Sequence, residues 1–186
     1  DAVQTVGKAP VDVKALGVDL LSLSAHKFGG PKGVGALVIK HGTPIARFHH
    51  GGSHERNLRA GTENVAGIVG MARALEVAHE DMDDCQRVTS KLAATFVAGV
   101  MDRIDGARVN SPEDGLPGTV NISFENVEGE SLVLGFDLEG ICLSTGSACA
   151  SGSMEPSHVV QAMGIGDDLA RGTLRFSFGR GNTAED

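Results

Sequence analysis

Positive charge is in short supply in this sequence, and so are long apolar runs. Lys and Arg total 16 against 24 Asp and Glu, which gives a net charge of −8. Because nucleic-acid phosphates favour a basic surface, nucleic acid is excluded as the main partner. No apolar run approaches the length of a membrane span, and the first residues lack the charged-then-apolar layout of a secretory signal. Neither a membrane nor a secretory route is indicated.

Cysteine is scarce as well. Three cysteines are present, an odd number without the spacing of a disulfide framework. Reduced thiols and a cytoplasmic setting are expected. Cys142 lies in the apolar run ICL and is predicted to be a core residue, whereas Cys85 is interpreted as incidental.

Both ends of the sequence indicate truncation. The sequence opens at Asp1 without a methionine, and it closes on RGNTAED, where Asn182 or Thr183 would cap a helix that then has no body. A fragment of a longer protein is expected.

The first section predicts two strands around a glycine turn. VDLLSLS (18–24) and ALVIK (36–40) are short runs rich in aliphatic residues, and the first is expected to be buried on both faces. The polar, glycine-containing segment 49–64 is expected to be an exposed loop.

The remainder predicts helices and further strands. Apolar residues recur at helical spacing over 65–78 and again over 88–104, with an acidic break at 79–85 between them. Strands are expected at 119–124 and 174–178, a short helix over 129–140 ending at Gly140, and a helix that starts at Pro156 and ends at Gly164. Strands separated by helices predict an α/β or α+β architecture.

The stretch SAHKFGGPKG (24–33) is the first candidate site. A lysine amine attacks carbonyls once it has lost its proton, and at the end of a buried strand Lys27 would be rigid and partly desolvated. Ser24 and His26 could donate hydrogen bonds to an anion such as a cofactor phosphate. The turn lacks the GK-Ser/Thr signature of a nucleotide phosphate loop. A solvated surface lysine is the alternative.

Two further residues are candidates. Cys149 lies in STGSACASGS (144–153), where small neighbours predict an exposed thiol on a loop; an incidental cysteine is the alternative. Arg175 stands in the alternating strand LRFSF, and its guanidinium suits a two-point contact with a carboxylate. The alternative for Arg175 is an edge-strand residue that faces water.

A metal site is not expected. The loop holds His49, His50, His54 and Glu55, but no zinc-type pairing accompanies them and the glycines argue against a rigid helix face.

Five separated motifs occur in a recognisable order: DAVQ, SLSAHKFGGPKGVGAL, GGSHERNLRAGTENV, GSACASGSMEPSHV and LRFSFGR. In this order they resemble the cysteine desulfurases of the NifS/IscS type, which are pyridoxal-phosphate enzymes of the fold-type I, class V aminotransferase superfamily. The resemblance implies that residues 1–80 are the C-terminal part of the large, cofactor-binding α/β domain. Residues 81–186 would be the small α+β domain, without its last helix.

The resemblance also assigns cofactor contacts. Lys27 would be the Schiff-base lysine, and Asp1 would face the pyridine nitrogen of pyridoxal 5′-phosphate and keep it protonated. Gln4 would hydrogen-bond the phenolic oxygen of the ring. Ser24 and His26 would hold the phosphate.

Three other roles are implied by the resemblance. Thr62 would reach the phosphate of the cofactor in the partner subunit of a homodimer. Arg175 would clamp the carboxylate of the substrate L-cysteine. Cys149 would accept the sulfur as a persulfide, release alanine, and pass the sulfur to a scaffold protein of iron–sulfur cluster assembly.

Two other functions stay open at this point. One is another class V pyridoxal-phosphate enzyme, such as a selenocysteine lyase or an aminotransferase, which Cys149 argues against because transamination needs no mobile thiol. The other is a non-catalytic fragment that binds a scaffold partner. The resemblance implies a family chain about twice as long, so these 186 residues hold the lysine, the thiol and the arginine but an incomplete pocket.

Overall fold

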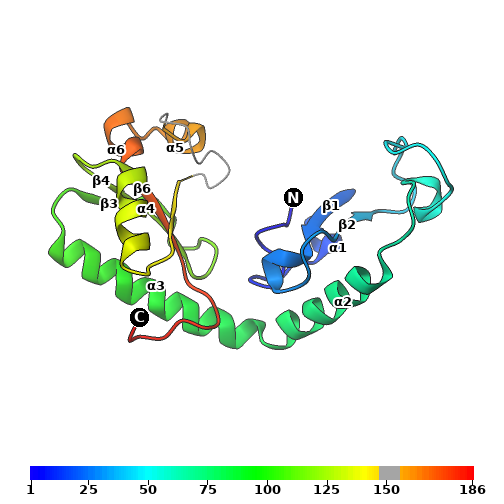
Figure 1. Cartoon of the computed structure of the whole chain (residues 1–186), viewed down its shortest axis with the longest axis horizontal. Helices are drawn as coiled ribbons and strands as arrows, with labels where there is room; N and C mark the ends of the chain where they lie inside the picture. Colours follow the sequence, from blue (N-terminus) through cyan, green and yellow to red (C-terminus); the bar gives the residue numbers. More distant parts are fainter. Residues whose placement is uncertain (147–155) are drawn as a thin grey trace. The chain divides into compact units, whose positions relative to one another are not determined.

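The computed structural model describes residues 1–146 and 156–186. Its contacts divide the chain into two compact units, Asp1–Asp84 and Cys85–Asp186. Figure 1 labels the α-helices and most of the strands of each unit. No helix in the described ranges is long and apolar enough to cross a membrane.

The first unit is built on an antiparallel pair of strands, β1 (Leu20–Ser24) and β2 (Gly35–Ile39). A short helix, α1 (Val13–Leu16), precedes the pair, and a 3-10 turn, η1 (Ala25–Phe28), follows β1 directly. The strands lie where the sequence predicts them. The expected burial of the first strand on both faces is wrong for this chain, because Leu20 of β1 is 44% exposed and its core contact is made through Leu21.

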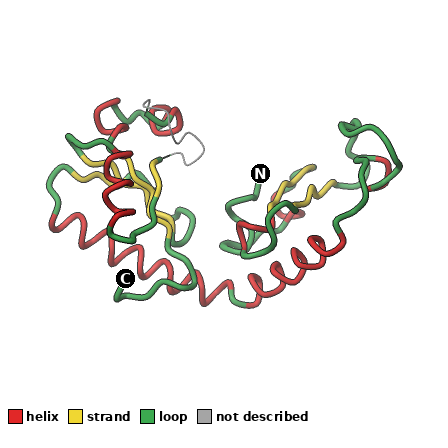
Figure 2. Tube along the Cα trace, viewed as in Figure 1, coloured by secondary structure: helices red, strands yellow, loops and turns green. Residues whose placement is uncertain are grey.

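A long loop and a helix complete the first unit. The loop runs from the end of β2 to α2 (Val65–Glu80) and contains a 3-10 turn, η2 (Glu55–Asn57), as Figure 2 shows. Asn64 caps α2 by accepting a hydrogen bond from the Gly67 N–H at 3.0 Å. The helix buries small residues, Gly67 and Ala78, whereas Val65 and Val69 of the predicted apolar face are 66% and 63% exposed.

The predicted acidic break between the two long helices is confirmed. α2 ends at Glu80, and α3 (Met82–Arg103) begins after Asp81. The Asp81 N–H still bonds to the carbonyls of Val77 and His79, so one residue separates the two helices.

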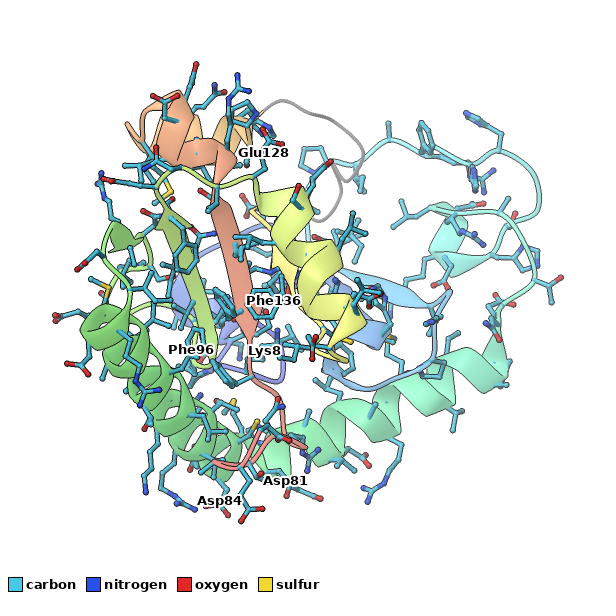
Figure 3. All side chains as sticks on the ribbon, turned by 60° about the vertical axis from the view of Figure 1, so that its left-hand side comes forward. Lys8, Asp81, Asp84, Phe96, Glu128 and Phe136 are labelled. Atoms are coloured by element: carbon cyan, nitrogen blue, oxygen red, sulfur yellow. The ribbon has the colours of Figure 1, made fainter. Side chains whose placement is uncertain are left out.

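The second unit is an antiparallel sheet in the order β3-β4-β6-β5, covered by helices. Its strands are β3 (Ala107–Val109), β4 (Thr119–Phe124), β5 (Ser144–Thr145) and β6 (Thr173–Ser177). One face packs against α3: Phe96, labelled in Figure 3, contacts the ring of Phe176 at a centroid distance of 4.5 Å. Ile122, at the centre of this core, is fully buried. The α+β architecture predicted for the second part is confirmed.

Three short helices belong to the same unit: α4 (Gly129–Leu138), α5 (His158–Ala162) and α6 (Asp167–Arg171). The predicted ends at Gly140 and Gly164 are correct, since both glycines have a positive φ just after a helix. Pro156 is not the first helical residue. It lies before Ser157, which is the N-cap of α5.

Candidate functional site

Lys27 lies on η1, a single turn that begins where β1 ends. The turn is closed by two hydrogen bonds to the Ala25 carbonyl, from the N–H groups of Gly29 and Gly30. Gly29 has φ +84°, a conformation that costs a residue with a Cβ more than it costs glycine. Ala25 is fully buried, so the turn is fixed at its base and presents the residues that follow.

Two glycines, Gly30 after the turn and Gly70 on α2, are required by the close packing between the turn and this helix. A Cβ on Gly30 would lie 2.9 Å from the Ala25 Cβ and 3.2 Å from the Ala74 Cβ. A Cβ on Gly70 would lie 2.7 Å from Cγ of Pro31. The turn therefore rests on the helix at a distance that leaves no room for side chains, and this contact fixes its height above α2.

Three polar side chains gather on this turn. The Ser24 hydroxyl and Nδ1 of His26 are 2.8 Å apart and hydrogen-bonded, and His26 and Lys27 are both exposed. The expectation that Lys27 is partly desolvated is not met by the described residues. The hydrogen-bonded pair Ser24 and His26 and the Lys27 amine thus belong to one fixed turn, which suits an anion with a reactive carbonyl nearby.

The N-terminal residues run beside β1. The Ala2 N–H donates to the Ser22 carbonyl at 2.9 Å, and Asp1 accepts a hydrogen bond from the Val3 N–H at 2.7 Å. Asp1 and Gln4 are both exposed. The backbone of this segment is thereby held against the strand that leads into Lys27.

Thr62 lies elsewhere in the first unit, in the exposed loop before α2. It follows Gly61, whose φ is +111°. The side chain that organises this loop is Arg47, which sequence reasoning missed because an arginine in a polar segment carries no local signal. Arg47 is half-buried and bonds to three residues of the loop.

Arg175 lies in the second unit on β6, between β4 and β5. Its cross-strand neighbours are Asn121 and Ser144. The alternative of an edge-strand arginine is therefore wrong: Arg175 is half-buried, and its Nε is buried with no hydrogen-bond partner among the residues that the structure describes. A buried donor without a partner is costly, and a bound acceptor such as a carboxylate would relieve that cost.

A polar network borders Arg175 on the same face of the sheet, because side chains alternate along β4 and β6. The Thr173 hydroxyl donates to the Leu169 carbonyl at 3.1 Å, so the Ser123 hydroxyl donates to Thr173 at 2.7 Å. Nδ2 of Asn110 donates to Ser123 and to Oδ1 of Asn121, both at 2.8 Å. These bonds fix the side chains beside Arg175 without using its guanidinium.

The cysteines divide differently from expectation. Cys142 is exposed, not part of the core, because the segment after α4 passes over the surface of its unit. Cys85 is half-buried on α3. Cys149 lies outside the described residues. Among the described residues, no three His, Cys, Asp or Glu side chains are grouped to hold a metal ion.

Residues 1–186 match the aminotransferase class-V family, and the chain belongs to that family. The family depends on pyridoxal 5′-phosphate. The cluster of Ser24, His26 and Lys27 and the unpartnered Nε of Arg175 fit such a cofactor and an amino-acid carboxylate. The fold is the mixed α/β fold of the fold-type I enzymes.

The relatives to which the chain is similar are cysteine desulfurases. A cysteine desulfurase IscS of Dictyoglomus turgidum is 55% identical over 188 residues, which cover 100% of this chain and 48% of the relative. The cysteine desulfurase IscS of Methanosarcina thermophila is 49% identical over 187 residues, which cover 100% of this chain and 46% of the relative. The chain thus spans about half the length of the curated relatives that it matches.

Solved structures give the same result. A NifS-like protein matches with a TM-score of 0.89 at 44% identity and covers 100% of this chain and 47% of its own. The NifS-like protein of Rickettsia africae matches with a TM-score of 0.89 at 31% identity, and the match covers 100% of this chain and 49% of that protein. Each match covers the whole of this chain and about half of the NifS-like protein.

We predict that Gly70→Ala destabilises the protein and that Gly99→Ala does not. The new Cβ at position 70 would meet the Pro31 ring at 2.7 Å, whereas a Cβ at Gly99 on α3 would meet nothing within 4 Å. Overpacking costs about 1–3 kcal/mol, and alanine in a helix gains about 0.5–1 kcal/mol over glycine. Urea unfolding should give a lower free energy for Gly70→Ala and a slightly higher one for Gly99→Ala. Equal stabilities would show that the contact with Pro31 is loose.

Proposed function

We propose that the protein containing this chain is a cysteine desulfurase. The observation that carries the proposal is the grouping of Ser24, His26 and Lys27 on one turn that two glycine contacts hold against α2. The IscS names of relatives 49–55% identical to the whole chain support this reaction. The reaction converts L-cysteine and an enzyme thiol to L-alanine and an enzyme persulfide.

In this proposal, pyridoxal 5′-phosphate supplies an electron sink for the substrate carbons when it is bound. Lys27 holds the cofactor through its aldehyde carbon. The hydrogen-bonded pair Ser24 and His26 donates to the phosphate. Asp1 pairs with the pyridine nitrogen, and Gln4 donates to the phenolic oxygen. The bond from Ala2 to β1 supports the two N-terminal roles by tying that segment to the strand that carries Lys27.

Other residues of the chain act on the substrate. Arg175 binds the carboxylate of L-cysteine, for which its buried, unpartnered Nε is suited. As a free amine, Lys27 would act as the base that moves the α-proton of the substrate. The Cys149 thiolate attacks the substrate sulfur: the S–S bond forms while the Cβ–S bond breaks, and the bonding electrons stay with the carbon skeleton that becomes alanine.

The arrangement of the whole enzyme is part of the same proposal. Residues 1–80 would complete a large cofactor-binding domain, and residues 81–186 would form the small domain. Two copies would form a homodimer in which Thr62 contacts the phosphate of the partner subunit's cofactor. The cytoplasmic protein would pass sulfur from Cys149 to a scaffold of iron–sulfur assembly.

Lys27→Ala should remove the covalent link to the cofactor in the full-length protein. The protein is incubated with pyridoxal 5′-phosphate, reduced with borohydride, and digested for mass spectrometry. The adduct is expected on the peptide containing position 27 and should be absent in the variant. Lys32→Ala is the matched control, since Lys32 lies in the same exposed segment and should leave the adduct unchanged. An adduct on another lysine would contradict the assignment.

Cys149→Ala should separate cofactor binding from sulfur transfer. The variant is expected to keep the visible absorbance of the bound cofactor and to lose sulfide release from L-cysteine by a factor of about 100 or more, because no thiol collects the sulfur. Cys142→Ala, at an exposed cysteine with no proposed role, should behave like the wild type. Undiminished release by Cys149→Ala would favour a lyase that needs no acceptor thiol.

Arg175→Lys should raise KM for L-cysteine about tenfold or more, because an ammonium cannot make the two-point contact of a guanidinium. Arg108→Lys is the control: Arg108 is exposed on β3 in the same sheet and is given no role. Steady-state kinetics of alanine formation measures both. Equal KM values for the two variants would remove Arg175 from the substrate site.

A further inference from the structure

Arg47 ties together two parts of the loop between β2 and α2. Its Nε donates to the Asn57 carbonyl at 2.6 Å, and one terminal nitrogen also donates to Oδ1 of Asn57. The terminal nitrogens reach the carbonyls of Gly51 and Gly52 at 3.3 and 3.5 Å. All these acceptors belong to the loop itself, so the guanidinium serves as a cross-link inside it.

The cross-link holds a segment that is unfavourable by itself. Glu55, Arg56 and Asn57 have φ values of 49°, 55° and 71°, three successive left-handed residues with a Cβ. A left-handed conformation is unfavourable for such a residue, and it persists where the surroundings fix it. Arg47 makes its two bonds to Asn57 at the end of this run. The hydrogen bonds from Arg47 thus restrain the strained turn at Asn57, its last residue.

The restraint extends toward Thr62 through close backbone contacts. The Ala60 N–H donates to the His49 carbonyl at 3.3 Å, and His49 and Arg59 form an isolated bridge. A Cβ on Gly51 would lie 3.0 Å from the Ala60 Cβ. The two runs of the loop lie side by side, with Arg47 bonded to both, and Thr62 follows Ala60 by one glycine.

We propose that Arg47 is a positioning residue that sets the direction in which the loop presents Thr62. This inference rests on the proposed function, in which Thr62 donates to a cofactor phosphate. Arg47 acts on binding only through the loop: it fixes the strained turn at Asn57 and the run at Gly51 and Gly52, and through them the backbone before Thr62. Loss of Arg47 should therefore weaken phosphate binding without removing a phosphate ligand.

The test compares the affinities of the full-length apoprotein for pyridoxal 5′-phosphate and for pyridoxal, which lacks the phosphate. Arg47→Ala and Thr62→Ala should each lower the ratio of the two affinities about tenfold, the order expected for one hydrogen bond to a charged group. Affinity for pyridoxal should stay constant in both variants. A general loss of structure would lower both affinities together and overturn the proposal.

Two more variants sharpen the result. Arg47→Lys keeps the charge but cannot span three residues of the loop, so it should resemble Arg47→Ala; a wild-type ratio would mean that charge alone suffices and would overturn positioning. It also supplies the test if Arg47→Ala does not fold. The double variant with Thr62→Ala should lose no more than Thr62→Ala alone, because Arg47 acts through Thr62.

The control is Arg73→Ala, which removes a guanidinium from α2 that is 64% exposed and pairs with Glu76. Its affinity ratio should equal that of the wild type. If Thr62→Ala lowers the ratio and Arg47→Ala does not, the role of Arg47 is refuted while the proposed function stands. If the wild type forms no adduct at Lys27, the proposed function itself fails.

Discussion

The contact of the turn at residues 25–31 with α2 is the constraint on which the first unit depends. Backbone and helix approach so closely that Gly30 and Gly70 have no space for a Cβ. Such an approach fixes position more strictly than packing between flexible side chains, because no rotamer change can absorb a displacement. The distance between η1, which carries Lys27, and α2 follows from this contact.

In the second unit, hydrogen bonds rather than close backbone packing fix the residues around the candidate side chain, Arg175. A hydrogen-bond chain runs from Asn110 through Ser123 and Thr173 to the Leu169 carbonyl, and its direction is fixed because a carbonyl can only accept. Arg175 stands beside this chain with Nε buried and unpartnered. Within the described residues, the Ser123 and Thr173 hydroxyls have partners, whereas Nε of Arg175 has none. In the proposed enzyme, this buried donor suits Arg175 to binding a carboxylate more than its charge alone would.

Sequence patterns predicted the longer elements but not the short ones α1, β3, β5 and α6, and they predicted burial poorly. The strands at β1, β2, β4 and β6 and the two long helices follow from periodicity, and the break at Asp81 follows from acidic composition. Burial predictions were wrong where burial depends on what packs against an element. Val65, Val69 and Ala78 share a helical face by spacing, yet only Ala78 of these three is buried by the described chain. The prediction that Cys142 is a core residue was wrong for the same reason, because the apolar triplet ICL does not show whether other parts of the chain cover it.

Some of the candidate residues could be predicted from the sequence, and one could not. Lys27 and Arg175 could be found from sequence, because each sits in a motif whose neighbours are unusual for a surface position. Arg47 could not, since its role depends on which carbonyls lie within reach of one guanidinium.

The position of the Lys27 amine and its reactivity toward a carbonyl have different structural causes. The turn supplies the position from local sequence, through Gly29, Gly30 and Pro31. Reactivity requires a neutral amine, which burial or a nearby cation favours, and Lys27 is exposed in the described residues. In the proposed enzyme, the residues that cover Lys27 would supply the desolvation, while this chain supplies the geometry.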